Sequence, residues 1–140
     1  MAVSREAVVE SAKSFERTPW RHGARIKGLG IDCTGLVICS FNECGAEIED
    51  IYDYSLFDEF TKLVRTLNRY CDKVSRKVLP GDILLFRGDD MLNHVGIVTD
   101  EKNFIHAYSV PSVMLVTIQP YDAYWKQRLR GIYSFKGFVN

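Results

Sequence analysis

The spacing of apolar residues changes about halfway along this 140-residue chain, and that change limits the folds open to it. Up to Tyr70 apolar residues recur at helical spacing, whereas after Lys77 they form short runs rich in Val, Ile, Phe and Tyr. The first pattern predicts helices over residues 4–16, 32–44 and 56–70, with a glycine-containing loop over 20–31. The second predicts strands over residues 83–86, 94–99, 103–109, 113–118 and 131–135, with a short helix over 121–127. Helices followed by strands are typical of the α+β class, here N-terminal helices packed on an antiparallel sheet.

Length and composition favour a single domain over residues 1–140. Lys and Arg number 18, Asp and Glu number 18, the formal net charge is zero, and 46% of the residues are hydrophobic. This balance argues against disorder, which accompanies low hydrophobicity and high net charge. It also argues against a nucleic-acid partner, because phosphate contacts need a surplus of basic residues. No apolar run reaches the roughly 18 residues that indicate a membrane span.

The first ten residues are charged and amphipathic, which is not the pattern of a secretory signal peptide. We therefore expect a protein made in the cytoplasm that either stays there or is carried across a membrane by something else. Removal of a signal before residue 1 is the third interpretation.

Four cysteines include one with a distinctive position. Cys33, Cys39, Cys44 and Cys71 form no Cys-x-x-Cys pair, so a zinc knuckle is not indicated. Cys33 is predicted to begin a helix just after Asp32, a good N-cap residue. Unpaired N–H groups and the helix dipole favour a thiolate there, and the thiolate is the nucleophilic form. Gly30 and Gly35, on either side of Cys33, are expected to let the backbone approach a substrate. The alternative interpretation is one more buried helix cysteine.

A cysteine nucleophile needs a base, and two histidines on consecutive predicted strands are candidates. Side chains alternate along a strand, so the turn between the strands decides whether His94 and His106 share a face. A two-residue turn would place them on opposite faces. A three-residue turn over 101–103, pairing Asp100 with Phe104, or a bulge would place them on one face. The hypothesis therefore requires an odd-length turn, for which Asn103 can adopt the left-handed conformation.

If the two histidines share a face, the three residues form a recognisable catalytic set. Cys33 attacks, His94 takes its proton, and His106 orients the His94 ring. A metal site with Cys33, His94 and His106 as ligands is the alternative, although the helix-start position of Cys33 favours a nucleophile. We expect no cofactor and no metal.

Four motifs resemble the NlpC-type cell-wall cysteine peptidases. Gly-Ile-Asp-Cys-Thr-Gly-Leu-Val (residues 30–37) resembles their cysteine signature, with Thr34 in place of the commoner Ser. Pro-Gly-Asp-Ile-Leu-Leu-Phe (80–86), Asn-His-Val-Gly-Ile-Val (93–98) and Phe-Ile-His-Ala (104–107) are similar to the segments that precede and contain the catalytic histidine and the third polar residue. The four motifs occur in the family's order, and the resemblance runs from about residue 19 to residue 108.

This resemblance implies a papain-like α+β fold and a thiol peptidase that hydrolyses peptidoglycan stem peptides. The usual target of the family is the bond between D-γ-glutamate and a diamino acid. Carried over to this sequence, Cys33 is the nucleophile, His94 the base and His106 the orienting residue.

The segment upstream of the cysteine departs from the family pattern. Many relatives have a Tyr there that helps to bind the substrate, whereas this chain has Thr-Pro-Trp-Arg-His-Gly (residues 18–23). Trp20 stands near the Tyr position but has no hydroxyl, so His22 or Arg21 would supply the polar contact instead. We assign substrate binding to Trp20, His22 and Asp32.

Pro-Trp-Arg-His (residues 19–22) and Gly-Leu-Gly-Ile-Asp-Cys (residues 28–33) are most similar to the branch found in phage tails and gene-transfer particles. This likeness implies a virion-associated cell-wall hydrolase, with the peptidoglycan peptide as substrate and tail-tip proteins as partners. Two other functions stay open at this point: a non-catalytic structural or adaptor module of a tail tip, and an acyl or amide transferase on the same fold.

Overall fold

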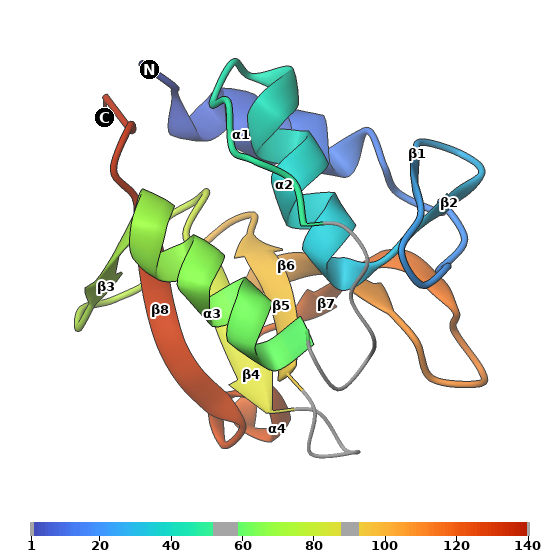
Figure 1. The fold of residues 1–140 in the computed structure, drawn as a ribbon. Helices are drawn as coiled ribbons and strands as arrows, with labels where there is room; N and C mark the ends of the chain where they lie inside the picture. Colours follow the sequence, from blue (N-terminus) through green and yellow to red (C-terminus); the bar gives the residue numbers. More distant parts are fainter. Residues whose placement is uncertain (1, 52–58, 88–92, 140) are drawn as a thin grey trace.

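The computed structural model describes residues 2–51, 59–87 and 93–139, with helices mainly in the first half and strands in the second (Figure 1). The helices are α1 (Arg5–Lys13), α2 (Cys33–Glu43), α3 (Glu59–Tyr70) and α4 (Ala123–Lys126). The strands are β1 (Arg25–Ile26), β2 (Gly30–Ile31), β3 (Cys71–Val74), β4 (Ile83–Arg87), β5 (Asn93–Val98), β6 (Asn103–Tyr108), β7 (Leu115–Pro120) and β8 (Leu129–Phe135). Each predicted element is found within three residues of its predicted ends; residues 56–58 of the third predicted helix lie outside the described residues.

Six of these strands form one antiparallel sheet in the order β3-β8-β4-β5-β6-β7. Helices α1 and α2 pack on each other, and α2 packs on β5 and β6 (Figure 1). The predicted α+β class, with N-terminal helices on an antiparallel sheet, is confirmed. No helix within the described ranges is both long and apolar enough to cross a membrane.

Three short strands were not predicted. β1 and β2 are two residues each and pair with one another inside the segment that the glycines marked as a loop. β3 is an edge strand that pairs with β8 only, and its central residues Asp72 and Lys73 are exposed. Such short strands lack the apolar alternation that marks a strand in sequence, so their pairing depends on tertiary contacts.

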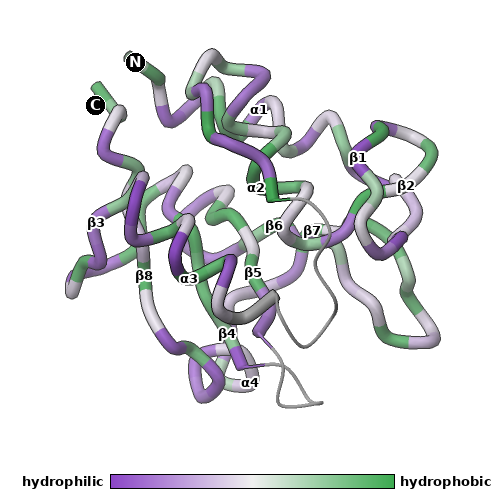
Figure 2. The backbone as a smooth tube through the Cα atoms, viewed as in Figure 1, coloured by the Kyte–Doolittle hydropathy of each residue, from purple (hydrophilic) through white to green (hydrophobic). Residues whose placement is uncertain are grey.

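The central strands bury both of their faces, which explains why they read as nearly continuous apolar runs. One face contributes to the main core beneath α1 and α2, through Ile83, Leu85, Val95, Ile97 and Ile105. The other face forms a second, aromatic core with α4, through Leu84, Phe86, Val98, Phe104 and Trp125. Figure 2 shows hydrophobic residues along β4, in the middle of the sheet.

Helix starts follow their capping residues, as predicted. Ser4 caps α1 by accepting a 3.0 Å hydrogen bond from the Ala7 N–H, and Asp32 caps α2 in the same way. The first helix ends three residues earlier than predicted, at Lys13. Residues 14–17 form tight turns instead, and Arg17 adopts a positive φ of 72° while its N–H bonds to Val116 in β7.

The Pro-Gly-Asp turn before β4 is tied to α1 by a buried carboxylate. Asp82 is fully buried and accepts hydrogen bonds from Arg5 Nη1 (3.0 Å), Arg76 Nη1 (2.7 Å) and the Leu79 N–H (2.8 Å). A buried charge needs such partners, because an unpaired one is costly in the protein interior. The motif that precedes the histidine strand therefore has a structural role in joining the helical layer to the sheet.

Candidate active site

Cys33 is the first residue of α2, where the sequence analysis placed it. Asp32 has an extended backbone (φ −106°, ψ −179°), and its Oδ1 accepts a 2.8 Å hydrogen bond from the Gly35 N–H. Cys33 is 7% exposed and belongs to the main core cluster together with Val95 and Ala107, the residues that follow His94 and His106. The helix that Cys33 begins therefore packs on the two strands that carry the histidines, β5 and β6.

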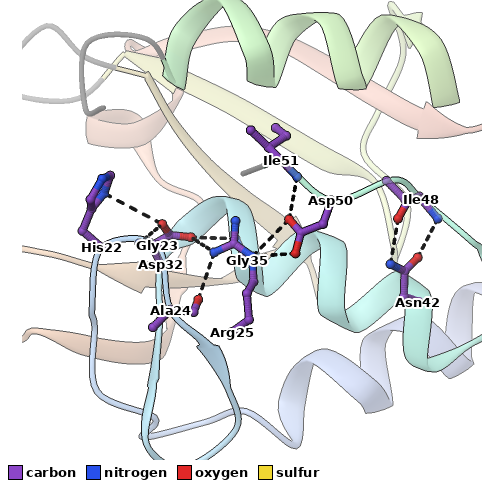
Figure 3. A network of polar contacts seen from close by, with 10 residues as sticks. All are labelled: His22, Gly23, Ala24, Arg25, Asp32, Gly35, Asn42, Ile48, Asp50 and Ile51. Carbon is purple, nitrogen blue, oxygen red and sulfur yellow. Dashed lines mark hydrogen bonds and ion pairs between the residues drawn. The ribbon is translucent and has the colours of Figure 1, made fainter. Parts of the chain in front are cut away.

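The carboxylate of Asp32 is the centre of a polar network that supports this helix start (Figure 3). Its Oδ1 also accepts from Arg25 Nη1 at 2.9 Å, and its Oδ2 accepts from the Gly23 N–H at 2.7 Å. Arg25 in turn bonds both oxygens of Asp50 through Nε, at 3.2 and 3.1 Å. Asp32 is 2% exposed, so its role is to hold the loop over residues 23–25 and the start of α2 together through these hydrogen bonds.

The glycines around Cys33 make room for this loop. A Cβ on Gly35 would lie 2.7 Å from Arg25 Nη1 and 3.0 Å from the Ala24 carbonyl oxygen. A Cβ on Gly30 would lie 2.7 Å from Arg21 Cδ. Residues of the chain itself therefore occupy the space that side chains at these positions would take, and the expectation that the glycines let the backbone approach a substrate stays a prediction.

Trp20 and His22 lie beside the same helix start. Trp20 forms a bridge with Ile31, two residues before Cys33, and its N–H donates to the Met114 carbonyl at 2.9 Å. His22 is exposed, and its Nδ1 lies 4.0 Å from Asp32 Oδ2 (Figure 3). The structure thus brings together Trp20, His22 and Asp32, the three residues predicted to bind substrate, next to the predicted nucleophile.

His94 and His106 are in direct contact, with 2.6 Å between His94 Nε2 and His106 Nδ1. Val98 pairs with Phe104, so the turn between the strands has odd length and the two histidines share a face, as the hypothesis required. The register differs from the predicted one, which paired Asp100 with Phe104; the turn is centred one residue earlier.

The turn is stabilised by a side chain instead of by a left-handed residue. Asp100 Oδ1 accepts from the Lys102 N–H at 2.8 Å and from Asn103 Nδ2 at 3.1 Å. Residues 99–104 are all described and none of them has a positive φ, so the left-handed conformation expected of Asn103 is not adopted. An Asx turn of this kind replaces that conformation because the carboxylate bonds the backbone two residues on.

His106 is enclosed by aromatic rings and fully buried. Its ring centroid lies 4.5 Å from that of Phe104, 4.7 Å from that of Tyr108 and 5.2 Å from that of Trp125. Burial, and then the neighbouring charge of His94, hold the pKa of His106 well below its ordinary value of 6.5. His106 is therefore neutral at physiological pH, and it contacts His94 as a neutral hydrogen-bonding group.

The strands part at this end of the sheet. β5 and β6 pair at Ile97–Ile105 and Val98–Phe104, whereas β5 continues to pair with β4 as far as Asn93, and β6 with β7 as far as Tyr108. Gly96 allows the close approach just before the strands part, since a Cβ there would lie 3.2 Å from His106 Cβ and 3.0 Å from the Ile105 carbonyl oxygen. The histidine pair thus spans two strands that no ladder hydrogen bonds join at this point.

Two residues of this region were missed in the sequence. Arg25 lies in the predicted loop, and no motif marks it as the partner of Asp32 and Asp50. Gln119 on β7 lies beyond the resembling segment, and its Oε1 is 3.1 Å from His106 Nε2. The alternation of side chains along β7 was the one available signal, because Gln119 pairs with Phe104 and so faces the histidine side of the sheet.

A metal centre finds no support in the arrangement of side chains. Within the described residues, no three His, Cys, Asp or Glu side chains gather in a way that could hold a metal ion. The alternative interpretation of Cys33, His94 and His106 as metal ligands is therefore not carried further.

Comparison with known proteins places the chain in a family. The family described as the NlpC/P60 family matches residues 17–134 of this chain. The probable endopeptidase NlpC of Escherichia coli strain K12 is 30% identical over 120 residues, which cover 84% of this chain and 70% of that protein. The murein DD-endopeptidase MepS/murein LD-carboxypeptidase of the same strain is 28% identical over 122 residues, covering 86% of this chain and 57% of that protein.

The fold agrees with that of a solved domain. The crystal structure of the NlpC/p60 domain of the peptidoglycan hydrolase SagA has a TM-score of 0.64 to this chain at 21% identity, over 95% of this chain and 100% of that domain. This likeness confirms the predicted papain-like α+β fold. With the match over residues 17–134, it follows that this chain belongs to the NlpC/P60 family.

Proposed function

We propose that this chain is a cysteine endopeptidase that hydrolyses peptidoglycan stem peptides, at the bond between D-γ-glutamate and a diamino acid. The observation that carries the proposal is the 2.6 Å contact between His94 Nε2 and His106 Nδ1, on the strands that pack against the Cys33 helix. Family membership and the murein DD-endopeptidase activity named for one relative support hydrolysis of peptidoglycan peptides, and the choice of the D-γ-glutamyl bond rests on the family resemblance of the four motifs. In this proposal Cys33 reaches His94 at the end of the sheet where β5 and β6 part.

The reaction divides the work between the helix start and the histidine pair. His94 Nδ1 takes the proton of the Cys33 thiol, because His94 Nε2 is occupied by His106. The thiolate attacks the scissile carbonyl carbon, and the Cys33 N–H at the start of α2 donates to the developing oxyanion. His94 then returns the proton to the leaving amine, which leaves a thioester. Water, deprotonated by His94, hydrolyses the thioester and restores the thiol.

Substrate binding falls to the segment beside the helix start. Trp20 supplies an apolar wall, and the exposed imidazole of His22 supplies a polar contact to the peptide. Asp32 holds this segment in place through Gly23 and Arg25 and so positions the substrate without touching it. This division follows from exposure, since His22 is exposed and Asp32 is 2% exposed.

The proposed setting is a phage tail or gene-transfer particle, where the domain opens the cell wall during entry with tail-tip proteins as partners. The likeness of the Pro-Trp-Arg-His segment (residues 19–22) to that branch supports this setting. Mass spectrometry of purified particles from the source strain tests it: the peptides of this chain should co-purify with tail proteins, and their absence from intact particles would contradict the setting.

The activity is tested on purified muropeptides of defined structure. Wild type should release a fragment with a new amine on the diamino acid, and Cys33→Ala should release none. Cys39→Ala, a change to a half-buried cysteine of the same helix, is the matched control and should retain activity. No product from either protein would overturn the proposal and favour the adaptor function, whereas equal product from both would overturn it by showing that Cys33 is not the nucleophile. A product joined to an added amine, in place of the hydrolysed acid, would identify the transferase.

A further inference from the structure

Gln119 is a polar side chain next to the histidine pair that the proposed mechanism has not used. It lies on β7, is half-buried, and pairs with Phe104 across the ladder. Its Oε1 lies 3.1 Å from His106 Nε2, the nitrogen of His106 that faces away from His94. A single line of hydrogen bonds therefore runs from Gln119 through His106 to His94.

The chemistry of an amide oxygen sets the direction of this line. In the orientation that the structure gives the Gln119 amide, Oε1 faces His106 Nε2; because a carbonyl oxygen can only accept a hydrogen bond, the proton of neutral His106 then resides on Nε2. His106 Nδ1 is then an acceptor, and the group that faces it at 2.6 Å must donate: this is His94 Nε2–H. A neutral His94 with its proton on Nε2 presents the lone pair of Nδ1 to the thiol.

The opposite tautomer would disable the pair. If His106 carried its proton on Nδ1, it would donate to His94 Nε2, and neutral His94 would hold its proton on Nδ1. That nitrogen would then be a donor, which cannot take the proton of Cys33. Both arrangements satisfy the contact between the two histidines, so this contact alone does not select the productive tautomer; a third group has to do so.

We propose that Gln119 is the positioning residue that selects this tautomer, through His106, so that His94 Nδ1 is the base. The role of the pair in catalysis rests on the proposed function, whereas the tautomers themselves are a property of the resting protein. The neutral amide also has an advantage over a carboxylate at this position. A Glu would stabilise a proton on both nitrogens of His106, and the protonated ring would donate to His94 from Nδ1.

Nitrogen NMR of protein labelled at the histidine rings reads the tautomers directly, without substrate. In wild type we expect the protons of both His94 and His106 on Nε2. In Gln119→Met, which has a side chain of similar length but no amide, a mixture of tautomers should appear in both rings. In Gln119→Glu, His106 should be protonated at a higher pH than in wild type. Gln127→Met, at an exposed position after α4, is the matched control and should leave both spectra unchanged.

Kinetics on muropeptides separate this role from a merely structural one. Gln119→Met should lower kcat by at least about 10-fold with KM unchanged, within the limit of about 10⁴-fold that a wrong tautomer costs the Ser-His-Asp triad. Gln119→Glu should also lower kcat, although it preserves side-chain size. Wild-type tautomers in both variants, or full activity in both, would overturn the inference. Tautomers that shift as expected in a protein inactive on muropeptides would support the inference while contradicting the proposed function.

Discussion

Replacing Asp32 by Asn tests whether the network at the helix start stabilises the protein as its geometry indicates. The carboxylate accepts hydrogen bonds from the N–H groups of Gly23 and Gly35 and from Arg25 Nη1. An amide has one oxygen and one NH₂ group. If the oxygen takes the place of Oδ1, it keeps Gly35 and Arg25, but the NH₂ group meets the donor of Gly23.

The cost follows from these bonds. The lost bond to Gly23, at an exposed residue, contributes about 1 kcal/mol, and the change from a charged to a neutral acceptor weakens the bonds to Arg25 and Gly35 by about 1–2 kcal/mol together. We therefore expect the free energy of unfolding to fall by about 2–3 kcal/mol. With a urea m-value of about 2 kcal/mol/M, the unfolding midpoint should fall by about 1–1.5 M.

Urea titration followed by circular dichroism measures this midpoint. Asp72→Asn, at an exposed position of β3, is the matched control and should change the free energy of unfolding by less than about 0.5 kcal/mol. Equal midpoints for Asp32→Asn and Asp72→Asn would refute the argument, because they would show that the buried network contributes no more than a surface carboxylate.

Three further predictions concern the cysteines, the buried histidine and the close contact beside it. Burial raises the pKa of Cys71 to about 12, so iodoacetamide at pH 7 should label Cys71 only after unfolding. The same reagent should label Cys33, the proposed nucleophile, in the native protein. Mass spectrometry checks this, because Cys33→Ala should lose the native label. Because the pKa of His106 is lowered in the folded protein, the unfolded chain binds a proton at His106 below pH about 6.5 whereas the folded protein does not. The contribution of His106 to the free energy of unfolding is therefore fully present above that pH and is lost as the pH falls. The free energy of unfolding should therefore fall by up to about 1.4 kcal/mol per pH unit below pH 6, a slope that His106→Asn should reduce and that His22→Asn, at an exposed position, should keep. Gly96→Ala should destabilise the protein by about 1–3 kcal/mol in the same urea assay, since its Cβ would lie 2.8 Å from a ring carbon and 3.0 Å from a carbonyl oxygen; wild-type stability would contradict the packing.

The order of helices and strands could be predicted because it depends on local signals. Apolar spacing, the Ser4 and Asp32 caps, and runs rich in β-branched and aromatic residues are each readable within about ten residues. The register of the histidine hairpin was predicted only in its parity. The position of the turn depends on the Asp100 side chain, which accepts a hydrogen bond from the Lys102 N–H. Several polar residues of the turn could have accepted such a bond, so the sequence alone did not show where the turn is centred.

The sequence by itself determined that the chain is an α+β domain with a cysteine at a capped helix start and two histidines on consecutive strands. These features are local, so their physical causes are contained in short segments. The tertiary structure alone decided which groups surround them: Arg25 on Asp32, and Gln119 on His106. Both partners come from elsewhere in the chain, β1 in the first case and β7 in the second, and only the packing of those elements brings them within hydrogen-bonding distance. In the proposed mechanism, the nitrogen of His94 that can take the thiol proton is therefore set by the folded sheet, although the histidines themselves are visible in the sequence.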